Sequence, residues 1–218
     1  MSERPSSRAC PLCGSPLYGW LTLPAPGAHA TVGRPVDEAE GGVRVLERCE
    51  ACGAGVERGP APVDLEAEAE GLAKTLESGD VVLAAPNRAS WQASLGGGGW
   101  AGVDQRTGRL LLSPAALRLL AERTGREITD PACPPLGRNQ GWMWQTLVNG
   151  LTFHPNFARE VRAGRLRVGN SRGRFAFAID CVVTALAAPF VALASVPLEL
   201  IASLTRRGGE LLARVESR

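Results

Sequence analysis

The clearest chemistry in the sequence is carried by two pairs of cysteines. Cys10 and Cys13 stand in Cys-Pro-Leu-Cys-Gly, and Cys49 and Cys52 repeat the spacing in Cys-Glu-Ala-Cys-Gly. In such a C-x2-C-G knuckle, the turn directs two thiolates at one metal ion, and the glycine allows the backbone conformation that the turn needs. Two knuckles together supply the four ligands of one tetrahedral ion. The sequence therefore predicts a structural zinc site formed by Cys10, Cys13, Cys49 and Cys52.

Two other uses of paired cysteines agree less well with the sequence. A disulfide framework is typical of exported chains, whereas residues 1–8 are polar and no apolar run follows them. We therefore expect no signal peptide and a cytoplasmic location. A redox C-x2-C site needs only one pair, placed where a strand runs into a helix, whereas this sequence has two pairs. The remaining cysteines, Cys133 and Cys181, are predicted to be buried free thiols.

Short strands must position the two knuckles. Trp20–Leu23 and Val43–Glu47 are predicted to pair, and residues 24–42 form an excursion between them. Gly59–Pro62 marks the end of this module. We expect residues 1–59 to form a zinc ribbon, in which the closed four-cysteine site stabilises a module with little core of its own.

The second domain, residues 60–218, is predicted to contain a strand, a loop, a helix and another strand over Gly79–Ile128. Val81–Leu83 is a short apolar strand that ends at a Pro-Asn turn. Ser113-Pro114 predicts the start of the helix, and Gly125 predicts its end. The glycine-rich Gly97–Gly102 opens no helix after a strand, so we expect a flexible loop there and not a phosphate-binding turn.

The order and spacing of these segments resemble the C-terminal, substrate-side half of zinc-ribbon class I S-adenosylmethionine-dependent methyltransferases. In that family a helix with a terminal glycine turn leads into the fifth strand, and Leu65–Gly79 occupies this place. The fifth strand runs into a Pro-Asn turn and a loop of the form SW…G..W.G.D, as at Pro86–Asp104. The next helix begins with Ser-Pro, as at Ser113, and the branch often carries an N-terminal zinc ribbon. The resemblance implies a closing strand, Glu210–Glu216, antiparallel between Asp80–Ala84 and Arg126–Thr129.

The cofactor half of that family has no counterpart in this sequence. The family binds its cofactor with a glycine-rich turn after the first strand and an acidic residue after the second. Each βαβ unit takes roughly thirty residues, but only about twenty separate the ribbon from the fifth strand. Neither His29 nor His154 lies in a nucleophile or base motif. We therefore expect no bound S-adenosylmethionine and predict no catalytic residue.

Aromatic and amide side chains of the substrate-side segments form a second candidate site. They could line an apolar pocket or stack on a base or sugar. Tryptophans in such numbers more often fill a small core. The candidate pocket for a substrate or partner comprises Asn87, Trp91, Trp100, Trp142 and Trp144.

Phe175–Leu204 is the longest apolar stretch. The 18 residues between Asp180 and Glu199 carry no charge, which is the lower limit for a bilayer span. Arginines flank both ends, which argues against a single crossing, and Pro189 and Pro197 interrupt the run. We predict an apolar helical hairpin that either lies on the inner face of a membrane or is buried against the sheet.

These features predict an α+β fold: a zinc ribbon, a truncated Rossmann-like methyltransferase half with a small mixed sheet, and a helical insertion over about residues 131–207. The leading functional hypothesis is a non-catalytic accessory or binding subunit, whose partner is a complete methyltransferase or another protein. The alternative is a methyltransferase whose cofactor half comes from a partner chain. A nucleic-acid module using the arginine-rich Asn156–Arg174 is the weakest hypothesis, because no aromatic residues alternate with those arginines.

Overall fold

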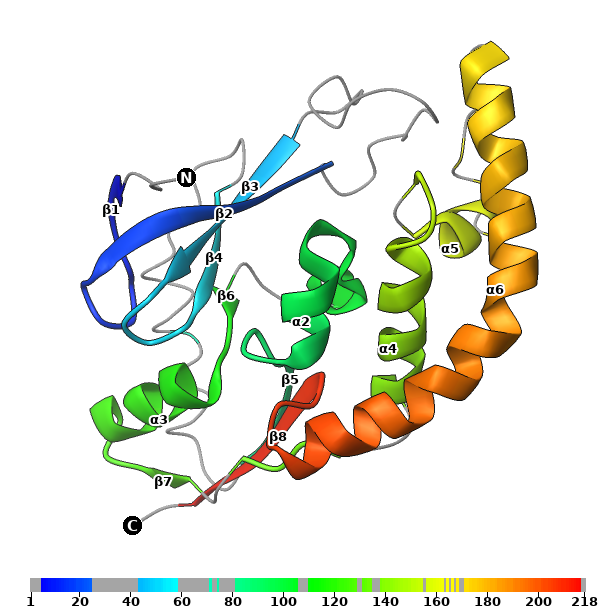
Figure 1. The fold of residues 1–218 in the computed structure, drawn as a ribbon. Coiled ribbons are helices and arrows are strands. Elements are labelled where there is room, and N and C mark those ends of the chain that lie inside the picture. Colours follow the sequence, from blue (N-terminus) through cyan, green and yellow to red (C-terminus); the bar gives the residue numbers. More distant parts are fainter. Residues whose placement is uncertain are drawn as a thin grey trace.

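The computed structural model of the chain describes residues 5–24, 43–58, 71, 74, 81–105, 110–128, 131–134, 138–154, 156–162, 164, 166, 168 and 171–216. These residues form two antiparallel sheets, several short helices and one long apolar helix (Figure 1). The mixed α and β content is confirmed. The excursion after Pro24 and most of the helix predicted over Leu65–Gly79 lie outside the described residues, although Gly71 and Lys74 are helical.

The first sheet has five strands in the order β1-β2-β3-β4-β6, and all of its pairings are antiparallel. Their bounds are β1 Pro5–Ala9, β2 Pro16–Pro24, β3 Val43–Cys49, β4 Gly55–Arg58 and β6 Leu110–Leu111. The predicted ribbon pairing is confirmed, since Leu17 lies opposite Cys49 and Leu23 opposite Arg44. Strand β6 was not predicted. It joins the ribbon sheet from the middle of the chain, so the ribbon continues directly into the rest of the fold.

Most of the described residues between the Pro-Asn turn and β6 are helical, so the prediction of a flexible loop over Gly97–Gly102 was wrong. It contains α2 (Trp91–Gly96) and two 3₁₀ turns, η2 (Gly97–Gly99) and η3 (Ala101–Gln105). The glycines permit close packing here: a Cβ on Gly102 would lie 2.5 Å from the Trp100 ring. Small residues in this segment therefore let the buried Trp100 fit against the backbone.

Helix α3 (Pro114–Arg123) agrees with its sequence signals. The Ser113 side chain caps its N-terminus, Pro114 occupies the first turn, and Gly125 just beyond its end has a φ of +66°. Its predicted apolar face is buried, with Leu117 and Leu120 at most 3% exposed. The local capping residues were therefore sufficient to predict this helix.

The second sheet has the strand order β5-β8-β7, with β5 at Val81–Pro86, β8 at Glu210–Glu216 and β7 at Glu127–Ile128. Strand β8 is antiparallel to both neighbours, as expected for the closing strand. The predicted order is confirmed. Three antiparallel strands occur in many folds, so the Rossmann-like interpretation stays a prediction.

The apolar stretch is one continuous helix and not a hairpin. Helix α6 (Ser171–Leu204) contains both Pro189 and Pro197. Each proline removes one backbone hydrogen bond and bends the helix, but a reversal also needs turn residues, and residues 181–204 contain no Gly, Asn or Asp. Figure 1 shows α6 curving around α4 (Arg138–Asn149), which lies on its concave side, with α5 (Phe157–Arg162) near its N-terminal half.

The apolar side of α6 faces away from the protein. Its most apolar 18-residue window has a mean hydropathy of 2.1, and only 6% of that window is buried inside the protein. The alternative of helices buried against the sheet stays a prediction. The side that faces α4 and α2 instead carries polar residues: Asp180, Ser195 and Glu199 are 0% exposed. Large apolar side chains point outward along the whole helix, at Phe175, Val182, Leu186, Phe190, Leu193, Leu200, Ile201 and Leu204.

Candidate functional site

The four predicted metal ligands converge at the ribbon end of the molecule. Their Sγ atoms all lie within 4.8 Å of one another. Cys10 Sγ lies 3.7 Å from Cys52 Sγ, and Cys13 Sγ lies 3.4 Å from Cys49 Sγ. A disulfide requires about 2.05 Å between the sulfur atoms, so the four cysteines are free thiols.

The two knuckles have matching backbone geometry. The Gly14 and Gly53 amides donate to the carbonyls of Cys10 and Cys49, at 2.8 and 3.0 Å. Both glycines have a positive φ, +73° for Gly14 and +71° for Gly53. This conformation is unfavourable for other residues, which confirms the role predicted for the glycine of each knuckle.

The spacing of the sulfur atoms fits a tetrahedral zinc ion. Four thiolates at the usual zinc–sulfur distance of about 2.3 Å lie about 3.8 Å apart. The Cys10–Cys52 separation of 3.7 Å matches this value. Three of the thiols are buried, and the fourth, on Cys13, is partly exposed. The cluster can therefore hold a metal ion such as zinc by the four cysteines alone, with no coordination position left for a substrate.

The thiols perturb one another in the way expected of a metal site. The Cys52 thiol lowers the pKa of Cys10 to about 5, and the same contact raises the pKa of Cys52 above its usual range. Burial raises the pKa of Cys49. Four thiolates this close repel one another strongly, and a divalent cation removes that repulsion when it binds.

Ser113 links the second knuckle to helix α3. Its Oγ donates to the Cys52 carbonyl at 2.6 Å and accepts from the Ala116 amide at 3.0 Å. Around this link, the cysteines share one hydrophobic core with apolar residues of β6, α3 and β8. The sequence identified Ser113 as a helix cap. Its contact with Cys52 had no sequence signal, because the two residues are 61 positions apart in the chain.

Ser113→Ala is expected to lower the free energy of unfolding by about 1–2 kcal/mol, because α3 loses its cap and Cys52 loses a hydrogen bond. It should also weaken metal binding roughly tenfold, as expected for a group that orients a ligand. Denaturant unfolding and competition with a chelator measure the two effects. Ser90→Ala is the matched control, since Ser90 caps α2 and should change stability alone. Equal metal affinity in both variants would contradict the role assigned to Ser113.

The candidate pocket residues lie in different surroundings. Asn87 is fully buried, and its Nδ2 donates to the Gly208 carbonyl at 2.9 Å. Trp100 is 1% exposed and lies 6.4 Å from the Trp20 ring, centroid to centroid. Each of these two residues therefore has a structural use in the core.

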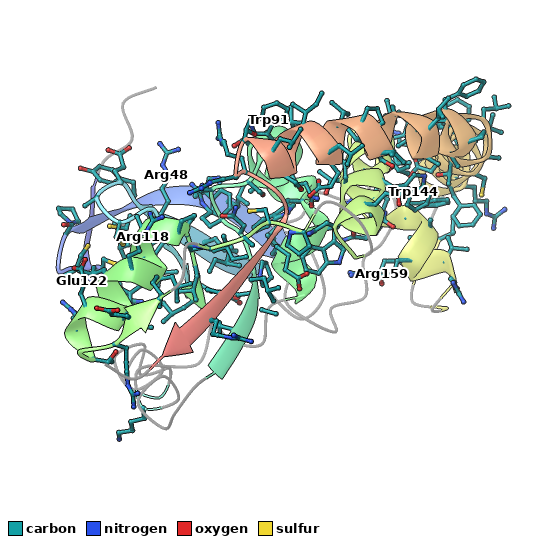
Figure 2. The ribbon with its side chains drawn as sticks, turned by 90° about the horizontal axis from the view of Figure 1, so that it is seen from below. Arg48, Trp91, Arg118, Glu122, Trp144 and Arg159 are labelled. Carbon is teal, nitrogen blue, oxygen red and sulfur yellow. The ribbon has the colours of Figure 1, made fainter. Side chains whose placement is uncertain are left out.

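The other three tryptophans of the candidate pocket are partly buried. The Trp91 amide donates to the Arg207 carbonyl, and the Trp144 Nε1 donates to the Ala188 carbonyl at 3.1 Å. Figure 2 shows Trp91 near the C-terminal end of α6 and Trp144 farther along the helix. Trp142 lies on α4, partly buried. A shared ligand pocket stays a prediction.

A buried polar cluster that the sequence analysis missed joins α2, α4 and α6. Gln92 Nε2 donates to Glu199 Oε2 at 2.8 Å and to the Asn139 carbonyl at 2.9 Å, while Glu199 Oε1 accepts from the Gly209 amide at 3.1 Å. The sequence carried one signal for this cluster, because Glu199 is the single acid near the end of the apolar stretch. A buried acid needs hydrogen-bond partners. This cluster attaches the C-terminal part of α6 to the rest of the protein.

The predicted free thiols differ in burial. Cys133 is buried, as predicted, but Cys181 lies on the exposed side of α6. The prediction for Cys181 was therefore wrong.

Comparison of the chain with protein-family models, curated proteins and solved structures gave no match.

Proposed function

We propose that the chain is a non-catalytic, zinc-stabilised accessory protein that binds at the cytoplasmic surface of a membrane. The observation that carries this proposal is the outward-facing apolar side of α6, where Phe190 is 75% and Leu193 is 77% exposed. Soluble monomers rarely expose continuous apolar surfaces of this extent. The polar residues of the helix face the protein instead, which is the reverse of a helix that packs onto a core from water.

The metal site supports a binding role over a catalytic one. Catalytic zinc keeps one position open for water or substrate, whereas four cysteine ligands close the coordination shell. Zinc held by Cys10, Cys13, Cys49 and Cys52 would stabilise the ribbon and the core that it shares with α3. The chemistry assigned to this ion is therefore structural.

A methyltransferase partner is proposed from the sequence resemblance. The strand order β5-β8-β7 agrees with the closing strands of that family, and the missing cofactor half would be present in a complete enzyme. This supports an accessory subunit of a methyltransferase. The second candidate is a methyltransferase that is active only when a partner chain supplies the cofactor half.

The attachment is tested by flotation of the purified protein with anionic phospholipid vesicles. The wild-type protein is expected to float, and Leu186→Glu/Leu193→Glu is expected to bind roughly 100-fold more weakly, because two charges replace side chains buried in lipid. Both side chains are exposed in the protein alone, so folding should be unchanged. Leu95→Glu is the control, since Leu95 is 62% exposed but lies on α2. Wild-type protein that stays with the soluble fraction would refute the attachment.

Titration with S-adenosylmethionine tests the non-catalytic assignment. The isolated chain is expected to show no saturable binding, because it lacks the family's glycine turn and ribose-binding acid, and each lost charge-assisted hydrogen bond costs roughly 1.5–3 kcal/mol. Calorimetry with the zinc-loaded protein measures this. Micromolar binding by the chain alone would instead favour the enzyme, whereas binding only after a methyltransferase is added would place the cofactor site in the partner.

A further inference from the structure

We propose that α6 lies in the plane of an anionic bilayer, embedded along one side, and that arginines at both of its ends bind lipid phosphates. This inference rests on the membrane attachment proposed above and adds its geometry and lipid class. The alternative geometry is a single crossing, which the length and composition of α6 alone would allow.

Hydrogen bonds at Asp180, Ala188 and Glu199 hold α6 against the protein along its length. Asp180 accepts hydrogen bonds from the Phe153 and His154 amides at 2.8 and 3.1 Å. Ala188 accepts from Trp144, and Glu199 accepts from Gln92. Residues 180 and 199 are about 28 Å apart along a helix with a rise of 1.5 Å per residue, which nearly equals the bilayer hydrocarbon thickness of about 30 Å. A crossing helix would therefore place Asp180 and Glu199 at the two boundaries of the hydrocarbon and carry Trp144 of α4 into it.

The attached segments are unsuited to that environment. Helix α4, which carries Trp144, would lie inside the hydrocarbon with the polar residues Gln145 and Asn149. Helix α5, which packs against Phe177 through Phe157 with ring centroids 5.2 Å apart, would bring Arg159 and Arg162 to the edge of the hydrocarbon. Charged side chains in the hydrocarbon are costly. An in-plane helix avoids this cost, because the folded protein stays on the aqueous side and only the outer side of α6 contacts lipid.

The shape of α6 matches this orientation. Figure 1 shows the helix bent with α4 on its concave side, so the outward apolar side is convex. Leu186, Phe190 and Leu193 lie in its middle part and are 67%, 75% and 77% exposed. A convex helix inserts its middle deepest and leaves both ends near the headgroups.

Basic residues lie at both ends of α6, and one of them, Arg207, also donates from its Nε to the Ala89 carbonyl at 3.2 Å. Arg172 and Arg174 are exposed in the first turn, and Arg206 and Arg207 are exposed just beyond Leu204. Positive charge at both ends is unfavourable for a crossing helix, because the positive-inside rule places the excess of Lys and Arg on the cytoplasmic side of the membrane. The same arrangement suits a helix whose two ends meet one layer of anionic phosphates.

The geometry is tested by labelling the full-length, zinc-loaded protein on preformed phosphatidylglycerol–phosphatidylcholine vesicles. Single cysteines replace Ser171 or Thr205, exposed residues at the two ends of α6, in a Cys181→Ser background. Cys133 is buried and the other four cysteines are protected by zinc. A membrane-impermeant maleimide added outside the vesicles is expected to label both positions equally. Binding should fall at least roughly tenfold on vesicles of phosphatidylcholine alone, which have no net negative charge, and in Arg206→Glu/Arg207→Glu, which loses the positive charge that an anionic surface attracts.

The outcomes separate the two proposals. Protein that floats but has one position protected until detergent is added would show a crossing helix and overturn the in-plane geometry, while the attachment itself would stand. Equal binding to vesicles with and without anionic lipid would overturn the arginine–phosphate contacts. Wild-type protein that does not float would overturn both proposals. If that protein forms a dimer in solution, and the dimer dissociates in Leu186→Glu/Leu193→Glu, a second copy of the chain covers α6 in place of lipid.

Discussion

Cys49→Ser is expected to release the metal ion and to unfold the ribbon together with its contact to α3. Cys49 is one of the four cysteines that can hold a metal ion, and it lies in the same core cluster as Leu117 and Leu120 of α3. Structural zinc contributes about 10–16 kcal/mol in small zinc-binding peptides, which is comparable with the whole stability of a typical domain, about 5–15 kcal/mol. Loss of the ion should therefore destabilise residues outside the ribbon strands as well. Elemental analysis and thermal unfolding followed by circular dichroism measure both effects.

Cys181→Ser is the matched control for this prediction. Cys181 is a free thiol exposed on α6, outside the metal cluster. Its replacement should leave the metal content and the melting temperature unchanged. Metal-free wild-type protein that melts like the metal-loaded protein would rule out a structural role for the site.

Glu199→Ala is expected to detach the C-terminal part of α6 from α2 and from the start of β8. The carboxylate accepts hydrogen bonds from Gln92 Nε2 and from the Gly209 amide, both in the interior. Each unsatisfied buried donor costs about 1–3 kcal/mol. Burial raises the pKa of the Glu199 carboxyl, so its removal returns part of the desolvation free energy. We therefore expect a net loss of roughly 2–3 kcal/mol in the free energy of unfolding, measured with urea.

Leu200→Ala provides the comparison at the next position. Leu200 is 39% exposed on the outward side of α6, and its truncation should cost under about 1 kcal/mol. Hydrogen exchange should show faster opening of α6 in Glu199→Ala and not in Leu200→Ala. Equal stability of the two variants would mean that the buried cluster does not hold the helix.

Short-range signals account for the parts of the structure that were predicted correctly. The turn of each knuckle and the capping residues Ser113 and Gly125 depend on residues within a few positions of one another. Local spacing determines such features because turn geometry and capping bonds form within one or two turns of chain. The order of β5, β8 and β7 was expected from the family resemblance and not from local spacing.

The errors arose where distant contacts or packing decide the outcome. Gly97–Gly102 suggested a loop, yet the segment forms 3₁₀ turns on both sides of the buried Trp100. Strand β6 is only two residues long, and its pairing with β4 brings together residues more than fifty positions apart. Glycine content and a two-residue apolar run carry too little local information to predict either arrangement.

The sequence by itself determined the metal ligands, the main capped helix and the presence of a long apolar segment between arginines. Only the tertiary structure decided that this segment is one helix with its apolar side outward. The physical reason is that the orientation of an apolar helix depends on where its few polar groups find partners. Asp180 finds them in the Phe153–His154 backbone and Glu199 in Gln92 and Gly209. Those partners come from three separate parts of the chain, and folding alone brings them to one side of α6.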